Sequence, residues 1–379
     1  MKPCVIFGAG AVSRLPRLLG RLGARRVLLV TGRSSFDRCG AADALSPALH
    51  GRDVTARFCE FSENPKIEDV LRGIEVFRAA PPDAVVAVGG GSALDMAKLV
   101  NVLSQQDADP IEIVLGLAPI RKPGRPLIAV PTTSGSGSEA THFAVVYVDR
   151  AKYSVAAPAL RPDGAVVDPA LTASLSPALT AVTGMDAFSQ AVESFWSVNS
   201  TAESKGLARR AIVLVLQHLP AAVHAPTPAA RRGMSKAAHL AGRAIDVTKT
   251  TGAHAMSYPL TSYFGVPHGH AVAITLGRWL LYNSQTTDED VVDPRGAQYV
   301  RATIAELVRM IGCPDPHSAS SRIEDLAASV GLVTRLGALG ITAAEALEII
   351  VPNVNVERIV NNPRAMDTAG LRRLVEAVC

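Results

Sequence analysis

The sequence predicts two domains, an α/β domain with a parallel sheet over residues 1–170 and an all-helical domain over residues 171–379. Before residue 170, short β-branched runs that end in glycine or threonine alternate with amphipathic helical patterns, as in parallel sheets whose strands are joined by helices. After residue 170 the strand-like runs stop, and long patterns rich in Ala and Leu take over. A chain of 379 residues, 48% of them hydrophobic, can bury the two cores that this division requires.

The individual elements follow from the spacing of apolar residues. Continuous apolar runs indicate strands buried on both faces, and apolar residues three and four positions apart indicate helices with one buried face. The predicted strands are 26–31 (RVLLVT), 83–91 (DAVVAVGGG) and 126–133 (PLIAVPTT). The predicted helices are 12–23, 66–80, 183–194 and 202–223.

Composition excludes several other classes of protein. A net charge of +4 with only 4% aromatic residues does not favour nucleic-acid binding. Five cysteines without a CxxC pair indicate neither a disulfide framework nor a thiolate zinc site. No apolar run reaches the roughly 18 residues that span a bilayer, and the first residues lack the apolar core of a signal peptide. We therefore expect a soluble cytoplasmic protein that binds neither membrane nor nucleic acid.

A glycine triplet follows the second predicted strand, in the segment VAVGGGSALDMAK (86–98). Strand, glycines and helix in this order aim free backbone N–H groups at an anion. Gly90 and Gly91 let the backbone approach a pyrophosphate, and Ser92 can cap the helix and donate to phosphate. We also expect Asp95, in the first turn of this helix, to contact the nucleotide. The alternative is a plain glycine turn with a serine cap, in which Asp95 only favours the helix dipole.

Two other segments bear on nucleotide binding. In PTTSGSGSEAT (131–141), the hydroxyl groups of Thr132, Thr133 and Ser136 can bind ribose, phosphate or the nicotinamide amide, although a flexible surface loop would have the same composition. The earlier GAGAVS (8–13) lacks the third glycine of the dinucleotide fingerprint and is better explained as a tight turn before a helix.

The loop after the first strong strand bears on the choice of cofactor. An acidic residue at this place binds the ribose 2′-hydroxyl of NAD, whereas a basic residue suits the 2′-phosphate of NADP. The strand runs into GRSS, so that Arg33, Ser34 and Ser35 are available and no acid is present. This favours NADP(H) over NAD(H); a solvated loop arginine is the alternative.

Candidate metal ligands lie in the helical half. In TGMDAFSQAVES (183–194), Asp186 and Gln190 are four residues apart and share one helical face. His254, His268 and His270 follow within 17 positions. Histidine is the commonest metal ligand, and a divalent metal can polarise a carbonyl oxygen. A local hydrogen-bonded pair and buried core histidines are the alternative.

These segments resemble the iron-containing (group III) alcohol dehydrogenases. The resemblance implies a Rossmann-like dinucleotide domain followed by a helical domain, the dehydroquinate synthase-like architecture, with metal and substrate in the cleft between them. It also implies a homodimer. The matching segments, in the family's order, are GGGSALDMAK, PTTSGSGSEAT, GMDAFSQAVES, HAMSYPLTSYFGVPHGHA and NNPRAM.

The resemblance assigns the metal, Fe²⁺ or Zn²⁺, to Asp186, His254 and His268, with Gln190 at the position of the remaining ligand. The family usually has histidine there, so Gln190 either ligates the metal through its weaker amide oxygen or binds the substrate. A second departure is Tyr258, which stands where many family members carry an additional histidine.

The resemblance also supplies roles for three further residues. Asn64 and Lys152 are implied as nucleotide contacts. His270, or water, is expected to supply the proton that completes aldehyde reduction.

Within the family, SYPLTSYFGVPHGHAV and NVERIVNNPR most resemble the phosphonoacetaldehyde reductases of phosphonate biosynthesis, which form 2-hydroxyethylphosphonate. A dianionic substrate needs cationic partners beyond the metal. The sequence does not rank the available ones, which are Lys249, Arg243, His142, His270, Arg358 and Arg364.

Three alternative functions remain at this point. One is a metal-free reductase like the maleylacetate reductases, in which His or Gln polarises the carbonyl directly. Another is a general short-chain alcohol dehydrogenase. The third is a nucleotide-binding protein without catalysis.

Overall fold

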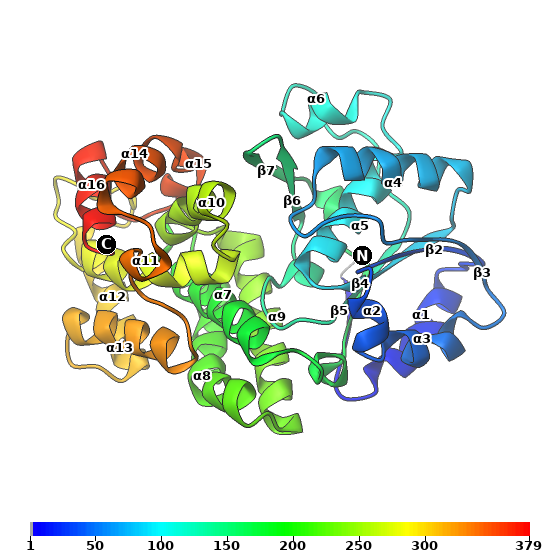
Figure 1. Cartoon of the computed structure of the whole chain (residues 1–379), viewed down its shortest axis with the longest axis horizontal. Helices are drawn as coiled ribbons and strands as arrows, with labels where there is room; N and C mark the ends of the chain where they lie inside the picture. The colour runs from blue at the N-terminus through cyan, green and yellow to red at the C-terminus, as the bar shows by residue number, and fades with distance from the viewer. Residues whose placement is uncertain (1–2) are drawn as a thin grey trace. The chain divides into compact units, whose positions relative to one another are not determined.

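The structure, a computed structural model, describes residues 3–379 and divides into two compact units, the first ending at Leu175 and the second beginning at Ser176 (Figure 1). The predicted fold class is confirmed. The first unit is built on a six-stranded parallel sheet, and the described residues of the second unit form helices and connecting loops.

The sheet has the strand order β1-β8-β5-β4-β2-β3, and every neighbouring pair is parallel. The three predicted strands are β2, β4 and β5 in its interior, where burial on both faces explains their unbroken apolar runs. A separate antiparallel hairpin, β6 and β7, was not predicted. The strands are β1 (Cys4–Phe7), β2 (Arg26–Thr31), β3 (Asp53–Phe58), β4 (Ala84–Gly89), β5 (Leu127–Pro131), β6 (Phe143–Val148), β7 (Ala151–Ala156) and β8 (Gly164–Val167).

Helices cover both faces of this sheet, α4 and α5 on one side and α1 and α3 on the other (Figure 1). Alternate residues of β2 show the division, since Leu28 packs with α4 and α5 while Val27 packs with α1 and α3. The helices of the first unit are α1 (Leu15–Arg21), α2 (Ser35–Arg38), α3 (Ala41–Leu49), α4 (Ile67–Ala79), α5 (Gly91–Leu103) and α6 (Pro110–Val114). Its 3₁₀ helices are η1 (Ala11–Arg14), η2 (Ser138–Ala140), η3 (Pro158–Leu160) and η4 (Pro169–Thr172).

The connections change face between β2 and β4. The chain leaves β2 toward α2 and α3, and leaves β4 toward α5 on the opposite face. Ligands of open α/β sheets bind at such a switch point, beyond the carboxyl ends of the strands. The segment 8–13 forms the expected turn, with Gly10 at φ 73° ahead of η1.

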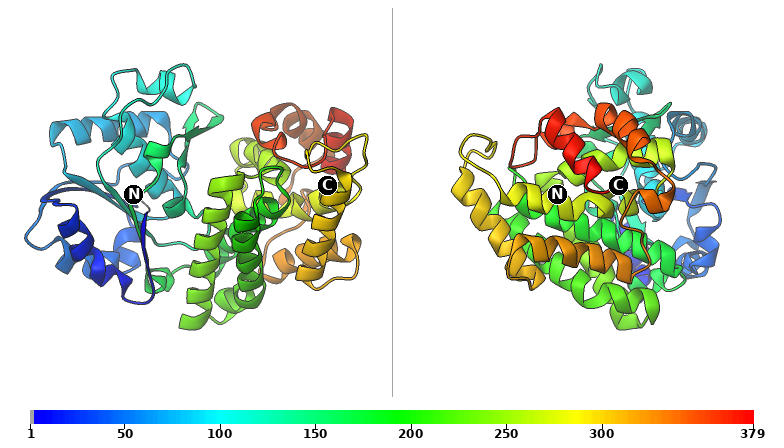
Figure 2. Two further views of the ribbon diagram at one scale, coloured as in Figure 1. Left: turned by 180° about the vertical axis from the view of Figure 1, so that it is seen from behind. Right: turned by 60° about the vertical axis from the view of Figure 1, so that its left-hand side comes forward.

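The second unit packs its helices around one large core that contains Phe188, Trp196 and Trp279. Its long helix α7 is capped by Ser176, whose hydroxyl accepts a hydrogen bond from the Leu179 N–H at 3.2 Å. The three long helices α7, α8 and α9 lie side by side, green in Figure 2. The helices are α7 (Pro177–Trp196), α8 (Ala202–His224), α9 (Pro228–Thr248), α10 (Gly252–Phe264), α11 (His268–Ser284), α12 (Ala297–Ile311), α13 (Pro316–Ser329), η5 (Gly337–Leu339), α14 (Ala343–Asn353), α15 (Val356–Ile359) and α16 (Thr368–Glu376).

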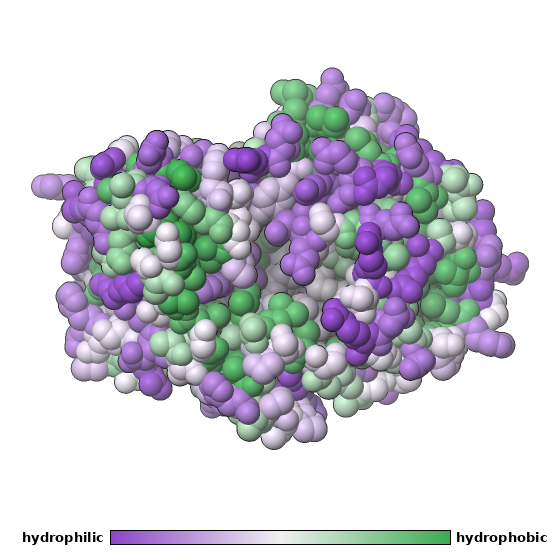
Figure 3. Space-filling view, viewed as in Figure 1, coloured by the Kyte–Doolittle hydropathy of each residue, from purple (hydrophilic) through white to green (hydrophobic). Residues whose placement is uncertain are grey.

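One helix of the described chain, α8, is long and apolar enough to cross a membrane by length and composition. It packs against α7 and α9 and buries Leu207, Ile212 and Leu219 in the core. These contacts are those of a core helix. On the face shown in Figure 3, hydrophilic residues cover most of the surface, and apolar residues occur in patches.

Candidate active site

The predicted nucleotide segments meet at the carboxyl ends of neighbouring strands. Gly89 at the end of β4 pairs with Pro131 of β5, and the Thr132 N–H donates to the Gly89 carbonyl at 2.9 Å. A Cβ atom on Gly91 would lie 2.8 Å from Ser136 Oγ, so glycine at this position lets the two segments approach closely. The two segments therefore form one continuous backbone and hydroxyl surface of the kind that binds phosphate.

Helix α5 holds the loop 131–141 in place. The carboxylate of Asp95 accepts hydrogen bonds from Ser138 Oγ at 2.5 Å and from the Val145 N–H at 3.0 Å. The fully buried Lys98 donates to the Thr141 and Phe143 carbonyls at 3.1 and 2.9 Å. The loop is thus anchored, not a flexible surface loop. Asp95 thus has a structural role in this loop, and its predicted contact with the nucleotide stays a prediction. Burial raises the pKa of Asp95, although Lys98 and Ser138 act in the opposite direction.

The loop that bears on cofactor choice follows β2. Arg33 and Ser34 are exposed, and Ser35 begins α2. Arg57 of the neighbouring β3 supports the loop, since its guanidinium donates to Thr31 Oγ1 at 2.9 Å and to the Arg33 carbonyl at 3.1 Å. Arg57 was not predicted from the sequence, because its contact with this loop depends on the order of the strands in the sheet.

Two further predicted nucleotide residues lie near the glycine turn or its anchors. The Asn64 N–H donates to Ser92 Oγ at 3.2 Å, and Asn64 adopts a left-handed φ of 58°. Lys152 lies on β7, where its charge reaches the Asp95 carboxylate. The first unit thus gathers the predicted nucleotide residues around the ends of β2, β4 and β5.

Three helices of the second unit bring the predicted metal ligands together. Asp186 comes from α7, His254 from the first turn of α10 and His268 from the first residue of α11. One candidate ligand atom from each lies within 4.8 Å of the others. His254 Nε2 and Asp186 Oδ1 are 3.4 Å apart, and the two imidazole centroids are 5.4 Å apart. These spacings leave room for one ion between the three side chains.

Gln190 shares the face of α7 that carries Asp186, one turn further on. Three buried atoms here have no hydrogen-bond partner, namely Asp186 Oδ1, Gln190 Oε1 and His254 Nε2. Leaving such a group unsatisfied costs about 1–3 kcal/mol. The two oxygens are electron-pair donors, and Nε2 is one when the imidazole is neutral, so a bound cation that displaces the imidazolium proton would satisfy all three together. Two imidazoles, a carboxylate and an amide oxygen are a suitable set for Fe²⁺ or Zn²⁺. The residues therefore fit a divalent metal.

Glu193 is a functional residue that the sequence analysis missed. It lies one further turn along the same face of α7 and has no exposed surface. Its carboxylate accepts hydrogen bonds from Thr251 Oγ1 at 2.9 Å, from the Ala253 N–H at 2.8 Å and from His254 Nδ1. It thereby fixes the start of α10 and keeps the proton of His254 on Nδ1. The spacing of residues 186, 190 and 193, which places them on one face of a helix, could have identified Glu193 from the sequence.

The electrostatics of this cluster favour a cation. Burial opposes a charge on His254, but the carboxylates of Glu193 and Asp186 outweigh it and raise its pKa to about 9. Burial likewise opposes ionisation of Asp186, but its contacts with His254, His268 and Gln190 lower its pKa. Without metal, His254 therefore holds a proton at neutral pH. A metal must displace this proton, so its apparent affinity falls as the pH drops below about 9.

Replacing Glu193 with glutamine is expected to weaken metal binding by about 10- to 100-fold, the usual cost of losing a partner that orients a ligand. Glutamine has nearly the same shape but presents an N–H group and no charge to the cluster. Competition with a chromophoric chelator measures the affinity for Co²⁺ or Zn²⁺. Glu203→Gln, a change at an exposed residue of α8, is the matched control, and equal affinities in the two variants would refute the role of Glu193.

The two remaining histidines face different surroundings. His268 Nδ1 contacts Ser257 Oγ at 3.2 Å, and the Ser257 hydroxyl donates to the His254 carbonyl at 2.7 Å, which links the two metal-site histidines. His270 instead places Nε2 2.7 Å from the Val333 carbonyl. This contact occupies one ring nitrogen of His270, and the expectation that His270 or water supplies the proton stays a prediction.

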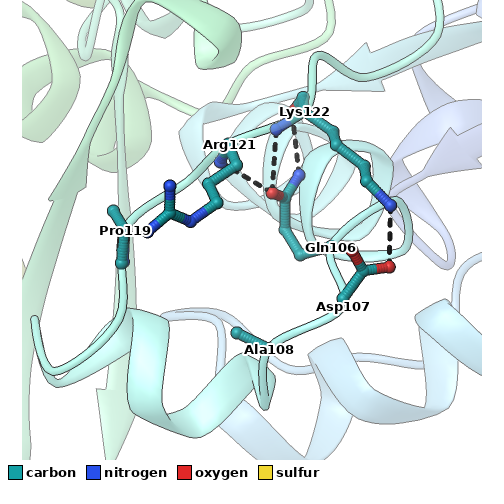
Figure 4. A pocket seen from close by; sticks show the side chains of 6 residues that line it. All are labelled: Gln106, Asp107, Ala108, Pro119, Arg121 and Lys122. Atoms are coloured by element: carbon teal, nitrogen blue, oxygen red, sulfur yellow. Dashed lines mark hydrogen bonds and ion pairs between the residues drawn. The ribbon is translucent and has the colours of Figure 1, made fainter.

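A surface pocket lies apart from both groups of residues (Figure 4). The Gln106 side chain lines this pocket. Its amide oxygen accepts hydrogen bonds from the Arg121 and Lys122 backbone N–H groups at 2.9 and 3.0 Å, and its amide nitrogen donates to the Lys122 carbonyl at 2.8 Å. Lys122 Nζ also pairs with Asp107 at 2.7 Å. The Gln106 amide and the Lys122–Asp107 pair are thus satisfied within the pocket wall.

Comparison with known proteins decides the family. The model of the iron-containing alcohol dehydrogenases matches residues 3–169, and that of the C-terminal domain of the Fe-containing alcohol dehydrogenase family matches residues 180–379. The chain belongs to the iron-containing alcohol dehydrogenase family. As a member, it is an NAD(P)-dependent oxidoreductase that acts on CH–OH groups and their aldehydes, and the family uses a divalent metal.

Several characterised members of the iron-containing alcohol dehydrogenases are similar over most of the chain. A phosphonoacetaldehyde reductase of Streptomyces viridochromogenes is 38% identical, over 88% of this chain and 85% of the relative. Long-chain-alcohol dehydrogenase 1 of Geobacillus thermodenitrificans is 32% identical, over 99% and 95%. The crystal structure of sulfoacetaldehyde reductase from Bifidobacterium kashiwanohense in complex with NAD⁺ superposes with a TM-score of 0.89 at 32% identity, covering 99% of this chain and 96% of that one.

Proposed function

We propose that the enzyme reduces phosphonoacetaldehyde to 2-hydroxyethylphosphonate with NADPH, a step of phosphonate biosynthesis. One aldehyde, one NADPH and one proton give one alcohol and one NADP⁺. The observation that carries the catalytic part is the set of unsatisfied electron-pair donors on Asp186, Gln190 and His254 beside His268. The similarity to a phosphonoacetaldehyde reductase at 38% identity supports the substrate.

The chain's own residues prepare the site for carbonyl reduction. When bound, a divalent metal supplies a Lewis acid that polarises the carbonyl and stabilises negative charge on its oxygen. Glu193 and Ser257 orient the two histidines through their Nδ1 atoms. The segments around Gly90 and Thr132 would hold the nucleotide, which would supply the hydride for the carbonyl carbon.

Gln190 is proposed as the fourth ligand through Oε1. This oxygen is buried without a hydrogen-bond partner, whereas the Gln190 side chain lowers the pKa of Asp186, as a donating amide N–H does. An amide that faced the substrate would instead present its N–H group.

NADPH is proposed as the preferred nucleotide. Arg33 is exposed beyond β2, with the Arg57 guanidinium beside it, and cationic groups at this position suit a 2′-phosphate. Asp37 lies 3.5 Å from Arg57 and neutralises part of that charge, so Arg33 is the main candidate. We also propose that the enzyme is a cytoplasmic homodimer; its free cysteines suit a reducing compartment.

The test is a nucleotide-oxidation assay with phosphonoacetaldehyde, sulfoacetaldehyde and propanal, each with NADPH and with NADH. We expect kcat/KM for phosphonoacetaldehyde to exceed that for propanal by about 100-fold or more, as for a substrate that adds a charged contact. Equal values would refute the phosphonate assignment. A higher value for sulfoacetaldehyde would move the assignment to the sulfonate, and faster oxidation of NADH would refute the NADPH preference.

A further inference from the structure

A line of buried polar groups continues from the candidate metal ligands into the core of the second unit. His254 contacts Asp186 through Nε2 and Glu193 through Nδ1. Glu193 Oε1 in turn accepts a hydrogen bond from Thr251 Oγ1 at 2.9 Å, and Thr251 Oγ1 lies 2.9 Å from Trp196 Nε1. Glu193 and Thr251 have no exposed surface and Trp196 is 2% exposed, so bulk water does not compete for these hydrogen bonds.

The direction of each hydrogen bond around Thr251 follows from the chemistry of its partners. An indole N–H can only donate and a carboxylate can only accept, whereas a hydroxyl has one proton to donate and lone pairs that accept. Thr251 therefore accepts from Trp196 and gives its single proton to Glu193. Its hydroxyl is used in both directions.

The place of Thr251 in the chain makes this use of its hydroxyl unusual. Thr251 is the N-cap residue of α10, where a threonine side chain commonly accepts a hydrogen bond from a backbone N–H two or three residues later. In the described structure its side chain makes no such bond, and the N–H groups of Ala253 and His254 donate to Glu193 instead, at 2.8 and 3.3 Å. The carboxylate thus caps α10, and the Thr251 hydroxyl is left to orient the carboxylate.

Thr251 joins the start of α10 to α7 at two points. Glu193 and Trp196 are three residues apart on α7 and so lie on one face of that helix. The same helix carries Asp186 two turns before Glu193. The contacts of Thr251 therefore hold the turn that presents His254 against the helix that supplies another candidate ligand.

We propose that Thr251 is a positioning residue of the metal site. Its hydroxyl, oriented by the Trp196 indole, holds the Glu193 carboxylate against His254 Nδ1. That contact keeps a ring proton on Nδ1 and leaves Nε2 for a metal. Without the hydroxyl, the carboxylate would lose a hydrogen-bond donor at a place that water does not reach, and would orient His254 less well. The inference rests on the proposed metal site, so its test measures metal binding directly.

The test compares Co²⁺ affinity, from competition with a chromophoric chelator, in Thr251→Val and Thr251→Ser. Valine keeps the shape of threonine without the hydroxyl, so Thr251→Val is expected to weaken binding by about tenfold, the lower end of the range for lost partners of metal ligands. Thr251→Ser keeps the hydroxyl and should stay within about threefold of the wild type. The visible spectrum of bound Co²⁺ should change in Thr251→Val and keep its wild-type form in Thr251→Ser.

Thr286→Val is the matched control. Thr286 is 1% exposed, and its hydroxyl donates to the Asn283 carbonyl at 2.7 Å, so the variant also loses one buried hydrogen bond. Its Co²⁺ affinity should match the wild type. Equal losses of affinity in Thr251→Val and Thr286→Val would refute the proposal, because they would show a general effect of losing a buried hydroxyl.

A double-mutant cycle tests whether Thr251 acts through Glu193. In a Glu193→Gln background, Thr251→Val should change Co²⁺ affinity by less than about twofold, because His254 has already lost the acceptor that Thr251 orients. Losses that multiply, as they do for independent sites, would contradict this route.

Trp196→Phe gives a second measurement that leaves Thr251 in place, should Thr251→Val fail to fold. It removes the indole N–H and keeps an aromatic ring, so Co²⁺ binding is expected to weaken by about threefold, as for the loss of one hydrogen bond. Unchanged affinity in Trp196→Phe would refute the part given to the indole.

The outcomes separate this inference from the proposed metal site. If the wild type binds no Co²⁺, the metal site fails and the role of Thr251 fails with it. If the wild type binds Co²⁺ and Thr251→Val binds it equally well, the metal site stands and the role of Thr251 is refuted.

Discussion

Replacing His254 with alanine is expected to lower kcat for aldehyde reduction by more than about 10³-fold, because loss of a ligand removes the Lewis acid that stabilises charge on the carbonyl oxygen. His254 is the centre of the cluster, since it contacts Asp186 through Nε2 and Glu193 through Nδ1. NADPH binding should be unchanged, because its predicted contacts all belong to the first unit. Steady-state kinetics, metal analysis and fluorescence titration with NADPH measure the three effects.

His317→Ala is the matched control for this variant. His317 is an exposed histidine on α13, and its removal should leave activity and metal content within error of the wild type. Near-normal activity of His254→Ala, or of the wild type after exhaustive chelation, would contradict the metal role. Loss of NADPH binding in His254→Ala would point instead to general disruption of the fold.

Replacing Gly269 with alanine is expected to destabilise the second unit by about 3 kcal/mol, at the upper end of the cost of overpacking. A Cβ atom at this position would lie 2.1 Å from the Val182 carbonyl oxygen and 2.9 Å from Asp186 Cβ. Backbone cannot rotate away as a side chain can, so α11 must move from α7. These helices carry His268 and Asp186, and their separation should also reduce the bound metal to well below one ion per chain.

Gly206→Ala provides the control for Gly269→Ala. Gly206 lies inside α8, and a Cβ atom there would meet nothing within 4 Å. This change should be neutral or stabilise by about 0.4–1 kcal/mol, because alanine loses less backbone entropy than glycine on folding. Thermal unfolding and metal analysis of both variants give the comparison. If Gly269→Ala unfolds at the same temperature as Gly206→Ala and keeps its metal, the close packing of α7 and α11 is wrong.

Local periodicity accounts for what the sequence could predict. The unbroken apolar runs of β2, β4 and β5 follow from burial on both faces, and the shared face of Asp186 and Gln190 follows from the helical repeat. The same repeat separates His268 from His270, because residues two apart point in nearly opposite directions on a helix.

Contacts between distant segments account for what the sequence could not predict. The hydrogen bond from Ser138 to Asp95 joins residues 43 positions apart, and the hydrogen bond from Thr251 to Glu193 joins residues 58 positions apart. Neither leaves a periodic pattern, so the structural role of Asp95 and the contact of Thr251 with Glu193 could not be predicted. The left-handed backbone conformation of Asn64 could not be predicted either, since glycine is the residue that usually adopts this conformation.

The most direct test of the metal site is anomalous diffraction from crystals of the metal-loaded protein, measured at the absorption edge of the bound ion. We expect one peak at about 2.0–2.2 Å from Asp186 Oδ1, Gln190 Oε1, His254 Nε2 and a ring nitrogen of His268. A peak bound by other residues, or no peak in protein that reduces aldehydes at full rate, would contradict the site. A peak held by the other three residues, with the amide of Gln190 turned away, would contradict the fourth ligand.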